Sequence, residues 1–319
     1  MRCDLKDECE PDSAALQGIT RRRFLGLAPV AVASLTLASG SEASEDELAQ
    51  AHALDPAVLI DLTRCVGCGR CVDACKADNG LDLRDDQPAI GPEAELASSN
   101  YTVVKALEVD GETVTVKRQC MHCLEPACAS VCFVKALTKS EAGPVVYDPN
   151  RCIGCRYCIM ACPFGIPTFD WEARFGRVNK CDLCVDRTSR GMPTACAEAC
   201  PGGALTFGRR EDMLAEAHRR LDSDPRYVKH IYGETEVGGT SVLYVSDVPF
   251  EKLGMRAGLP DEPLPGYTWE ITRLIPPAAA GIGAALVTLY LRRVRVLEEE
   301  RAAKAAISEP ENLLGKGDS

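Results

Sequence analysis

The chain has 319 residues, enough for one or two domains with a buried core. Its net charge of −11 argues against nucleic-acid binding, which requires a basic surface. Cysteine is the unusual residue, with 18 copies beside only 4 histidines, and 16 of the 18 lie between Cys65 and Cys200. An even number of cysteines at repeated spacings is consistent with a disulfide framework, zinc sites or iron–sulfur clusters.

Residues 1–43 have the features of an export signal. The segment Thr20-Arg-Arg-Arg-Phe-Leu25 leads into an apolar run of 13 residues, Leu25 to Leu37, which small residues follow. This order of basic, apolar and small residues is typical of a signal peptide, and the paired arginines resemble a twin-arginine (Tat) signal. A short membrane anchor and a chance basic patch are the alternatives. Cys3 and Cys9 lie in this region and are interpreted as incidental thiols.

Four groups of four cysteines follow the signal region. In chain order, groups 1 to 4 are Cys65, Cys68, Cys71 and Cys75; Cys120, Cys123, Cys128 and Cys132; Cys152, Cys155, Cys158 and Cys162; and Cys181, Cys184, Cys196 and Cys200. Groups 1 and 3 have the bacterial ferredoxin spacing C-x2-C-x2-C-x3-C, and Pro163 follows group 3. Group 2 has the spacing x2-x4-x3, whereas group 4 has x2-x11-x3 and precedes Pro201.

The spacing within these groups predicts iron–sulfur ligation. Three thiolates close together can surround one [4Fe–4S] cluster, and the fourth, beyond the loop, reaches a neighbouring cluster. The four groups therefore predict four [4Fe–4S] clusters with no cysteine left over, although spacing alone does not show which groups pair. Zinc sites explain C-x2-C pairs but not the repeated third and fourth cysteines, and cysteines two residues apart rarely form good disulfides.

The order of the four groups resembles the iron–sulfur electron-transfer subunits of membrane-bound oxidoreductases. This family includes formate dehydrogenase, DMSO reductase, polysulfide reductase and uptake nickel–iron hydrogenase. The resemblance covers Ile60 to about Phe207 and is carried by LTRCVGC, QCMHCLEPAC, DPNRCIGCRYCIMACPFGIP, KCDLC and CAEACPGGAL. It implies that group 1 pairs with group 4, and group 2 with group 3. Phe133 departs from the family, in which proline often follows the last cysteine of group 2.

The resemblance also implies the ligands of each cluster. They are Cys65, Cys68, Cys71 and Cys200 for cluster 1; Cys75, Cys181, Cys184 and Cys196 for cluster 2; Cys120, Cys123, Cys128 and Cys162 for cluster 3; and Cys132, Cys152, Cys155 and Cys158 for cluster 4. His122, inside group 2, is interpreted as lying beside a cluster or facing a partner rather than as a ligand. Lys180, Arg151, Arg156 and Arg118 flank the cysteines and either tune cluster potentials or are solvated.

Ordinary elements are expected between the groups. Asp110-Gly111 has the turn chemistry of a hairpin between strands at 101–104 and 114–117. Asn79–Ser99 is interpreted as a surface insertion, and Trp171 with the adjacent Phe169 as packing residues.

The segment after group 4 resembles one branch of this family more than the others. Apolar residues at helical spacing predict a helix over 211–221, and Ser241–Val245 predicts a strand. His230 to Met255 resembles the HybA-type iron–sulfur subunit of periplasmic uptake hydrogenase in IYGE, GGT-x-VL and VP-F/Y-E-x-L.

Leu274–Leu291 is predicted to cross a membrane. It has 18 residues without a charge, near the lower limit for a bilayer span, and Pro276 lies at its start, where proline is tolerated. Arg292 and Arg293 follow directly, which by the positive-inside rule places the C-terminus in the cytoplasm and the cysteines on the periplasmic side. A buried helix of a soluble protein is the alternative.

Together these features predict an α+β fold of tandem bacterial-ferredoxin-like repeats that bind four [4Fe–4S] clusters, with one C-terminal transmembrane helix. The expected organisation is a Tat signal region at 1–43, a four-cluster domain at 55–210, a family-specific extension at 211–270, the transmembrane helix at 274–291 and a cytoplasmic tail at 292–319. No catalytic triad, phosphate loop or acid–base pair is recognised, so a non-catalytic conductor of electrons is predicted.

The resemblance implies the partners and the location. The partners would be the catalytic and small iron–sulfur subunits of a nickel–iron hydrogenase and an integral membrane quinone-reactive subunit. The protein would lie at the periplasmic face of the cytoplasmic membrane. Two alternatives stay open: the same role in a molybdenum or tungsten enzyme such as formate dehydrogenase, and a zinc- or disulfide-stabilised exported interaction protein.

Overall fold

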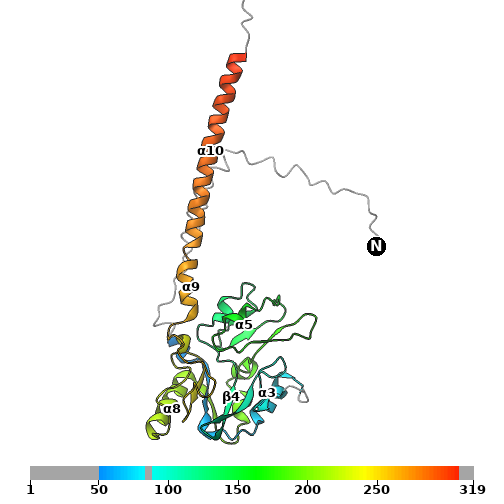
Figure 1. Ribbon diagram of the computed structural model, residues 1–319, viewed down its shortest axis with the longest axis vertical. Helices are drawn as coiled ribbons and strands as arrows, with labels where there is room; N and C mark the ends of the chain where they lie inside the picture. Colours follow the sequence, from blue (N-terminus) through cyan, green and yellow to red (C-terminus); the bar gives the residue numbers. More distant parts are fainter. Residues whose placement is uncertain (1–49, 83–87, 309–319) are drawn as a thin grey trace, which may run out of the picture. The chain divides into compact units, whose positions relative to one another are not determined.

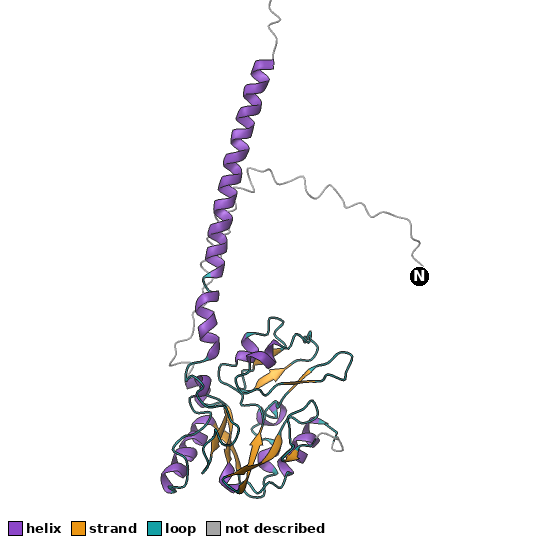
Figure 2. Ribbon diagram, viewed as in Figure 1, coloured by secondary structure: helices purple, strands orange, loops and turns teal. Residues whose placement is uncertain are grey.

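The computed structural model describes residues 50–82 and 88–308. The predicted export signal, with Cys3 and Cys9, lies outside the described residues, as does the end of the predicted tail. The described chain divides after Ile271 into a cysteine-rich domain and a C-terminal helical segment. Short helices and strands joined by loops build the cysteine-rich domain (Figure 2).

A three-stranded sheet joins the two ends of the cysteine region. Its central strand β1 (Pro56–Asp61) pairs antiparallel with β9 (Leu205–Arg209) and parallel with β10 (Val242–Val245). Four consecutive apolar residues of β1 are fully buried, as expected for a strand covered on both faces. Because group 1 begins just after β1 and group 4 ends just before β9, the antiparallel pairing brings these two groups together.

Helix α8 (Arg210–Ser223) covers one face of this sheet (Figure 1). Met213, Ala217 and Leu221 recur at intervals of four residues and pack against Leu59 of β1 and residues of β10. The first turn is acidic and the last turn contains Arg220, which suits the helix dipole. The helix predicted over 211–221 is therefore confirmed.

The predicted hairpin is also confirmed. Strands β3 (Val103–Val109) and β4 (Glu112–Arg118) pair antiparallel around Asp110-Gly111, whose φ angles of 54° and 87° are those of a hairpin turn. The predicted insertion contributes β2 (Ile90–Gly91), which pairs with β3.

The remaining elements of the cysteine region are short. They are η2 (Leu62–Arg64), α3 (Arg70–Asn79), α4 (Ala127–Ser130), β5 (Leu137–Lys139), β6 (Val145–Tyr147), α5 (Tyr157–Ala161), β7 (Thr168–Phe169), β8 (Val178–Asn179), α6 (Val185–Thr188) and α7 (Ala195–Glu198). The third cysteine of each group lies in a helix and is buried: Cys71, Cys128, Cys158 and Cys196. The rest of each group lies mainly in loops, so little regular structure holds these cysteines in place.

The extension after group 4 is joined to group 2 through its backbone. Its strand β10 matches the predicted strand and adds to the central sheet. The N–H groups of Ser241 and Val242 donate to the carbonyl oxygens of His122 and Met121, at 3.0 and 3.1 Å. The turn η3 (Glu236–Gly238) precedes this contact. The extension therefore supports the group 2 loop.

Two helices end the described chain. Helix α9 (Leu264–Thr272) has no counterpart among the elements predicted from the sequence, and its first turn contains Pro265 and Gly266, which are both poor helix formers. Helix α10 (Ile275–Ser308) has Pro276 in its first turn, where a missing N–H costs nothing. It contains the one candidate membrane span among the described residues, Ile275–Ala305, and continues past Leu291 into the predicted tail.

Candidate iron–sulfur cluster sites

All four groups form their C-x2-C loop in the same way. The residue before the second cysteine has a left-handed backbone in each group: Gly67, His122, Gly154 and Leu183, with φ between 48° and 72°. In groups 3 and 4 this residue donates its N–H to the Sγ of the first cysteine, over 3.4 Å. The loop therefore turns around the cysteine sulfurs and directs backbone N–H groups at them, an arrangement that stabilises charged sulfur.

A second left-handed position distinguishes groups 1 and 3. Gly69 and Arg156 both precede the third cysteine, with φ of 74° and 62°. A Cβ on Gly69 would lie 2.0 Å from Cδ1 of Ile90, so a side chain there would have to displace the end of this isoleucine. The Arg156 guanidinium instead stacks over the rings of Trp171 and Phe169, at 4.7 and 5.5 Å from their centroids.

Three cavities of the domain are each lined by four cysteines from two groups. The first is lined by Cys65, Cys68, Cys71 and Cys200; the second by Cys75, Cys181, Cys184 and Cys196; and the third by Cys132, Cys152, Cys155 and Cys158. In each, one cysteine comes from the partner group, as expected for fourth cysteines that cross over.

The four remaining cysteines also form a set. Burial raises the pKa of the Cys123 thiol well above its usual range, and repulsion from Cys120, Cys162 and Cys128 raises it further. These four residues are therefore close together. The structure thus brings together each of the four sets that the family resemblance implies, whereas iron ligation by them stays a prediction.

The donor sets suit a multi-atom cluster better than the alternatives. All sixteen described cysteines are free thiols. Within residues 50–82 and 88–308, no three His, Cys, Asp or Glu side chains converge closely enough for a single metal ion. Burial raises the pKa of Cys71 to about 11 and of Cys75 to about 12, with Lys117 as the main opposing charge. These buried thiols therefore need positive charge, such as iron supplies, before they ionise.

The four sets follow one another in a row. Burial is the main cause that raises the pKa of Cys71, Cys181 and Cys128, and a smaller cause in each is repulsion from a cysteine of the next set: Cys196, Cys120 and Cys158. Set 1 therefore lies near set 2, set 2 near set 3, and set 3 near set 4. The two exposed cysteines of the described chain, Cys68 and Cys155, belong to the two end sets.

His122 does not face a partner, because its side chain is fully buried. Its Nδ1 accepts the N–H of Val145 at 3.0 Å, and burial lowers the pKa of the ring well below its usual value. Neutral His122 therefore joins the group 2 loop to β6.

The flanking charges have different roles. Lys180 is buried and donates to the carbonyl oxygen of Cys181 at 2.9 Å, whereas Arg151 is exposed.

Trp171 is 69% exposed and stacks edge-on with Phe169, with 5.1 Å between the ring centroids. Lys117, fully buried, was not predicted because a lysine in an amphipathic strand normally faces solvent.

Comparison with known proteins identifies the class. Residues 112–210 match the 4Fe-4S dicluster domain and residues 56–77 match a 4Fe-4S binding domain. The chain is thus a ferredoxin-like protein that carries multiple [4Fe–4S] clusters.

Individual relatives narrow the family. The chain is 38% identical over 236 residues to the hydrogenase-2 operon protein HybA of Escherichia coli O157:H7, covering 62% of this chain and 72% of HybA. It is 36% identical over 262 residues to the iron–sulfur subunit of the nitrate-inducible formate dehydrogenase of Escherichia coli K12, covering 75% of this chain and 85% of that subunit. A protein of Nitratidesulfovibrio vulgaris is 39% identical over 304 residues, covering 90% and 82%. The chain belongs to this family of iron–sulfur electron-transfer subunits.

Proposed function

We propose that the chain conducts electrons, without catalysing a reaction itself, between the catalytic and small subunits of a nickel–iron hydrogenase and a quinone-reactive membrane subunit. The similarity to HybA supports a hydrogenase complex. The row of four cysteine sets is the observation that carries a conducting role, because it runs from one exposed cysteine to the other.

We further propose the cluster ligands implied by the family resemblance. The three cavities lined by four cysteines each, and the proximity of Cys123 to the three cysteines that raise its pKa, support these sets. When bound, each cluster takes up and releases one electron at a potential set by its surroundings. The protein's own part is to exclude water by burial and to direct N–H groups such as those of Gly154 and Leu183 at the sulfurs.

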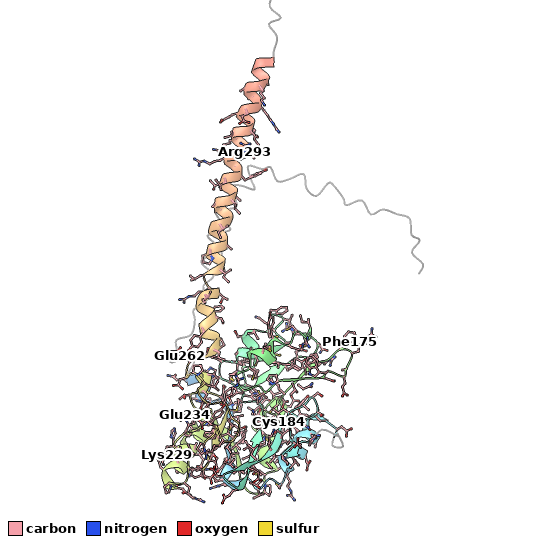
Figure 3. The ribbon with its side chains drawn as sticks, viewed as in Figure 1. Phe175, Cys184, Lys229, Glu234, Glu262 and Arg293 are labelled. Atoms are coloured by element: carbon pink, nitrogen blue, oxygen red, sulfur yellow. The ribbon has the colours of Figure 1, made fainter. Side chains whose placement is uncertain are left out.

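The set 4 end of the row, at Cys155, is suited to contact partners. Around Cys155, group 3 exposes Ile153, Tyr157 and Met160, which are 61%, 62% and 84% exposed. Phe175, 80% exposed, projects at the edge of the domain (Figure 3). Exposed apolar and aromatic side chains gathered in this way are typical of protein interfaces.

The export signal and α10 support a location at the periplasmic face of the cytoplasmic membrane. The apolar part of α10 is long enough to span a bilayer, and Arg292, Arg293 and Arg295 follow it. A reporter that is active only in the cytoplasm should be active when it is fused to the C-terminus, and one that is active only in the periplasm should be inactive. A periplasmic reporter signal would contradict this orientation.

A molybdenum or tungsten formate dehydrogenase is the second candidate complex. It is favoured by the longer match, because the formate dehydrogenase subunit aligns with 75% of this chain and HybA with 62%. Mass spectrometry of the complex purified from membranes decides between them. A nickel–iron subunit supports the hydrogenase, and a molybdenum or tungsten subunit supports the formate dehydrogenase.

Metal analysis tests the clusters independently of the partner. The purified chain should contain about sixteen irons with equal acid-labile sulfide, as four [4Fe–4S] clusters require. Zinc in place of iron, or sixteen oxidised thiols, would overturn the proposal.

A further inference from the structure

Lys117 is a buried cation without an anionic side chain beside it. It is 0% exposed, and no ion pair joins its Nζ to a carboxylate within the described ranges. Its Nζ donates to Thr102 Oγ1 at 2.7 Å and to Gln119 Oε1. Both partners are neutral and buried. An ammonium group in such surroundings is costly unless negative charge lies nearby.

Gln119 has the complementary feature. Because the Lys117 ammonium can only donate, it fixes the carbonyl oxygen of Gln119 on the lysine side and the NH₂ on the other. This Nε2 is buried and has no hydrogen-bond partner among the described residues. A buried donor left unsatisfied costs about 1–3 kcal/mol, so a native partner is expected.

The cavity of the second cysteine set lies beside both residues. Thr102 and Gln119 line it, together with Cys75, Cys181, Cys184 and Cys196. The lysine therefore touches the cavity only through the two residues to which it donates. A negative charge also lies close to this cavity, on the Asp182 carboxylate. Its Oδ1 accepts the N–H of Cys184, one of the lining residues, at 2.8 Å.

We propose that Gln119 donates its free N–H to a sulfur of cluster 2 and that Lys117 polarises this amide, so that the pair raises the potential of cluster 2. This proposal rests on the proposed ligation of cluster 2. A reduced cluster has one more negative charge than an oxidised one. A donor backed by a cation stabilises the reduced form more, so loss of either residue should make cluster 2 harder to reduce. The electron comes from the adjoining cluster in the row.

Redox titration followed by electron paramagnetic resonance tests this, with the complex purified anaerobically from membranes. The variants are Lys117→Met and Gln119→Leu, and Cys184→Ser identifies the signal of cluster 2. In each of the first two, the ratio of reduced to oxidised cluster 2 at the wild-type midpoint should fall at least tenfold, equal to 59 mV for one electron. Clusters 3 and 4 should keep their midpoints.

Lys105→Met is the matched control. Lys105 lies on the same hairpin, opposite Val116, but its Nζ pairs with exposed Glu95, so its loss should leave cluster 2 unchanged. The double variant Lys117→Met/Gln119→Leu should shift cluster 2 by less than the sum of the single shifts, because the lysine acts through the amide.

Iron content separates this inference from the proposed function. Full iron with unchanged midpoints in both single variants, or an equal shift of all four clusters, would overturn the role of Lys117 and Gln119. Too little iron in the wild-type chain would overturn the proposed ligation instead. If the Lys117→Met variant alone fails to bind iron, the Gln119→Leu variant decides, because that substitution removes no charge. An unshifted midpoint of cluster 2 in Gln119→Leu would then reject the inference.

Discussion

At the scale of single residues, the four C-x2-C loops share one backbone conformation without sharing one sequence. The left-handed position before the second cysteine holds glycine in two groups, histidine in one and leucine in one. A left-handed non-glycine residue costs about 1 kcal/mol. His122 offsets this cost through its bond to Val145, and Leu183 through burial in the main core.

Gly233 shows where glycine cannot be replaced. Its φ is 100°, and a Cβ would lie 2.5 Å from the carbonyl oxygen of Val242. Gly233→Ala should lower the free energy of unfolding by about 2–4 kcal/mol, from backbone strain plus overpacking. Gly254→Ala, with φ of 68° in open space, should cost only about 1 kcal/mol. Chemical denaturation of both variants measures the difference, and equal losses would contradict it.

Single cysteines can be tested by metal analysis. Cys200→Ser removes one proposed ligand from the first cavity and should reduce the iron content from about sixteen to about twelve per chain. Cys9→Ser serves as the control and should retain full iron, since Cys9 is interpreted as an incidental thiol of the signal region. Loss of iron in the control would show that this interpretation is wrong.

At the scale of elements, a buried charge network fastens α8 to the end of β1. Asp61 is fully buried and accepts hydrogen bonds from Arg220 at 2.9 Å and Tyr227 at 2.8 Å through one oxygen, and from Thr63 through the other. Every lone pair of the carboxylate thus finds a donor near the start of group 1. A network satisfied in this way keeps the cysteine-bearing loop at a set distance from the sheet.

Arg220→Met should therefore be strongly destabilising. It leaves the buried Asp61 charge with hydroxyl and amide donors and with the half-exposed Arg64, whose Nε lies 3.3 Å from Oδ2, and should cost about 3 kcal/mol. Tyr227→Phe removes a single hydrogen bond and should cost about 0.5–1.5 kcal/mol. Urea denaturation of the two variants compares these losses. A larger loss in Tyr227→Phe would contradict the central place of Arg220.

At the scale of the whole molecule, the apolar cores differ in their use of cysteine. The core between α8 and the central sheet, which includes Leu59, Ala217 and Leu243, contains no cysteine among its described residues. The main core and the smaller core around β5 and β6 both include cysteines, among them Cys181 and Cys158. Of the three, only the first is therefore expected to be independent of iron.

Iron removal should therefore unfold the domain unevenly. After anaerobic chelation, amide hydrogen exchange should stay slow in β1, β10 and α8 and become fast in the four cysteine loops, because the loops have little regular structure of their own. The iron-loaded protein provides the reference. Uniform loss of protection would show that the α8 core also depends on the clusters.

Removal of the C-terminal helix tests the division after Ile271. A chain ending at Thr272, expressed without partner subunits, should bind as much iron as the full chain and leave the membrane fraction. The reason is that the cysteine sets lie before this point, whereas the candidate span lies after it. Retention in the membrane after a high-salt wash would contradict the anchoring role of α10.

The amino-acid sequence by itself determined the features that depend on local spacing. Each C-x2-C loop, the amphipathic period of α8, the turn at Asp110-Gly111 and the long apolar stretch of α10 depend on residues close in sequence. The pairing of the groups was implied by the family resemblance, because the spacing of the cysteines does not determine it.

Only the tertiary structure decided what depends on distant parts of the chain. The β1–β9 register brings group 1 beside group 4, across more than half of the cysteine domain. The burial of Lys117, and the cavity that Gln119 faces with its neighbours, depend on the packing of β4 against loops that follow it much later. A lysine in a strand normally faces water, but Lys117 is buried because segments distant in sequence pack over it.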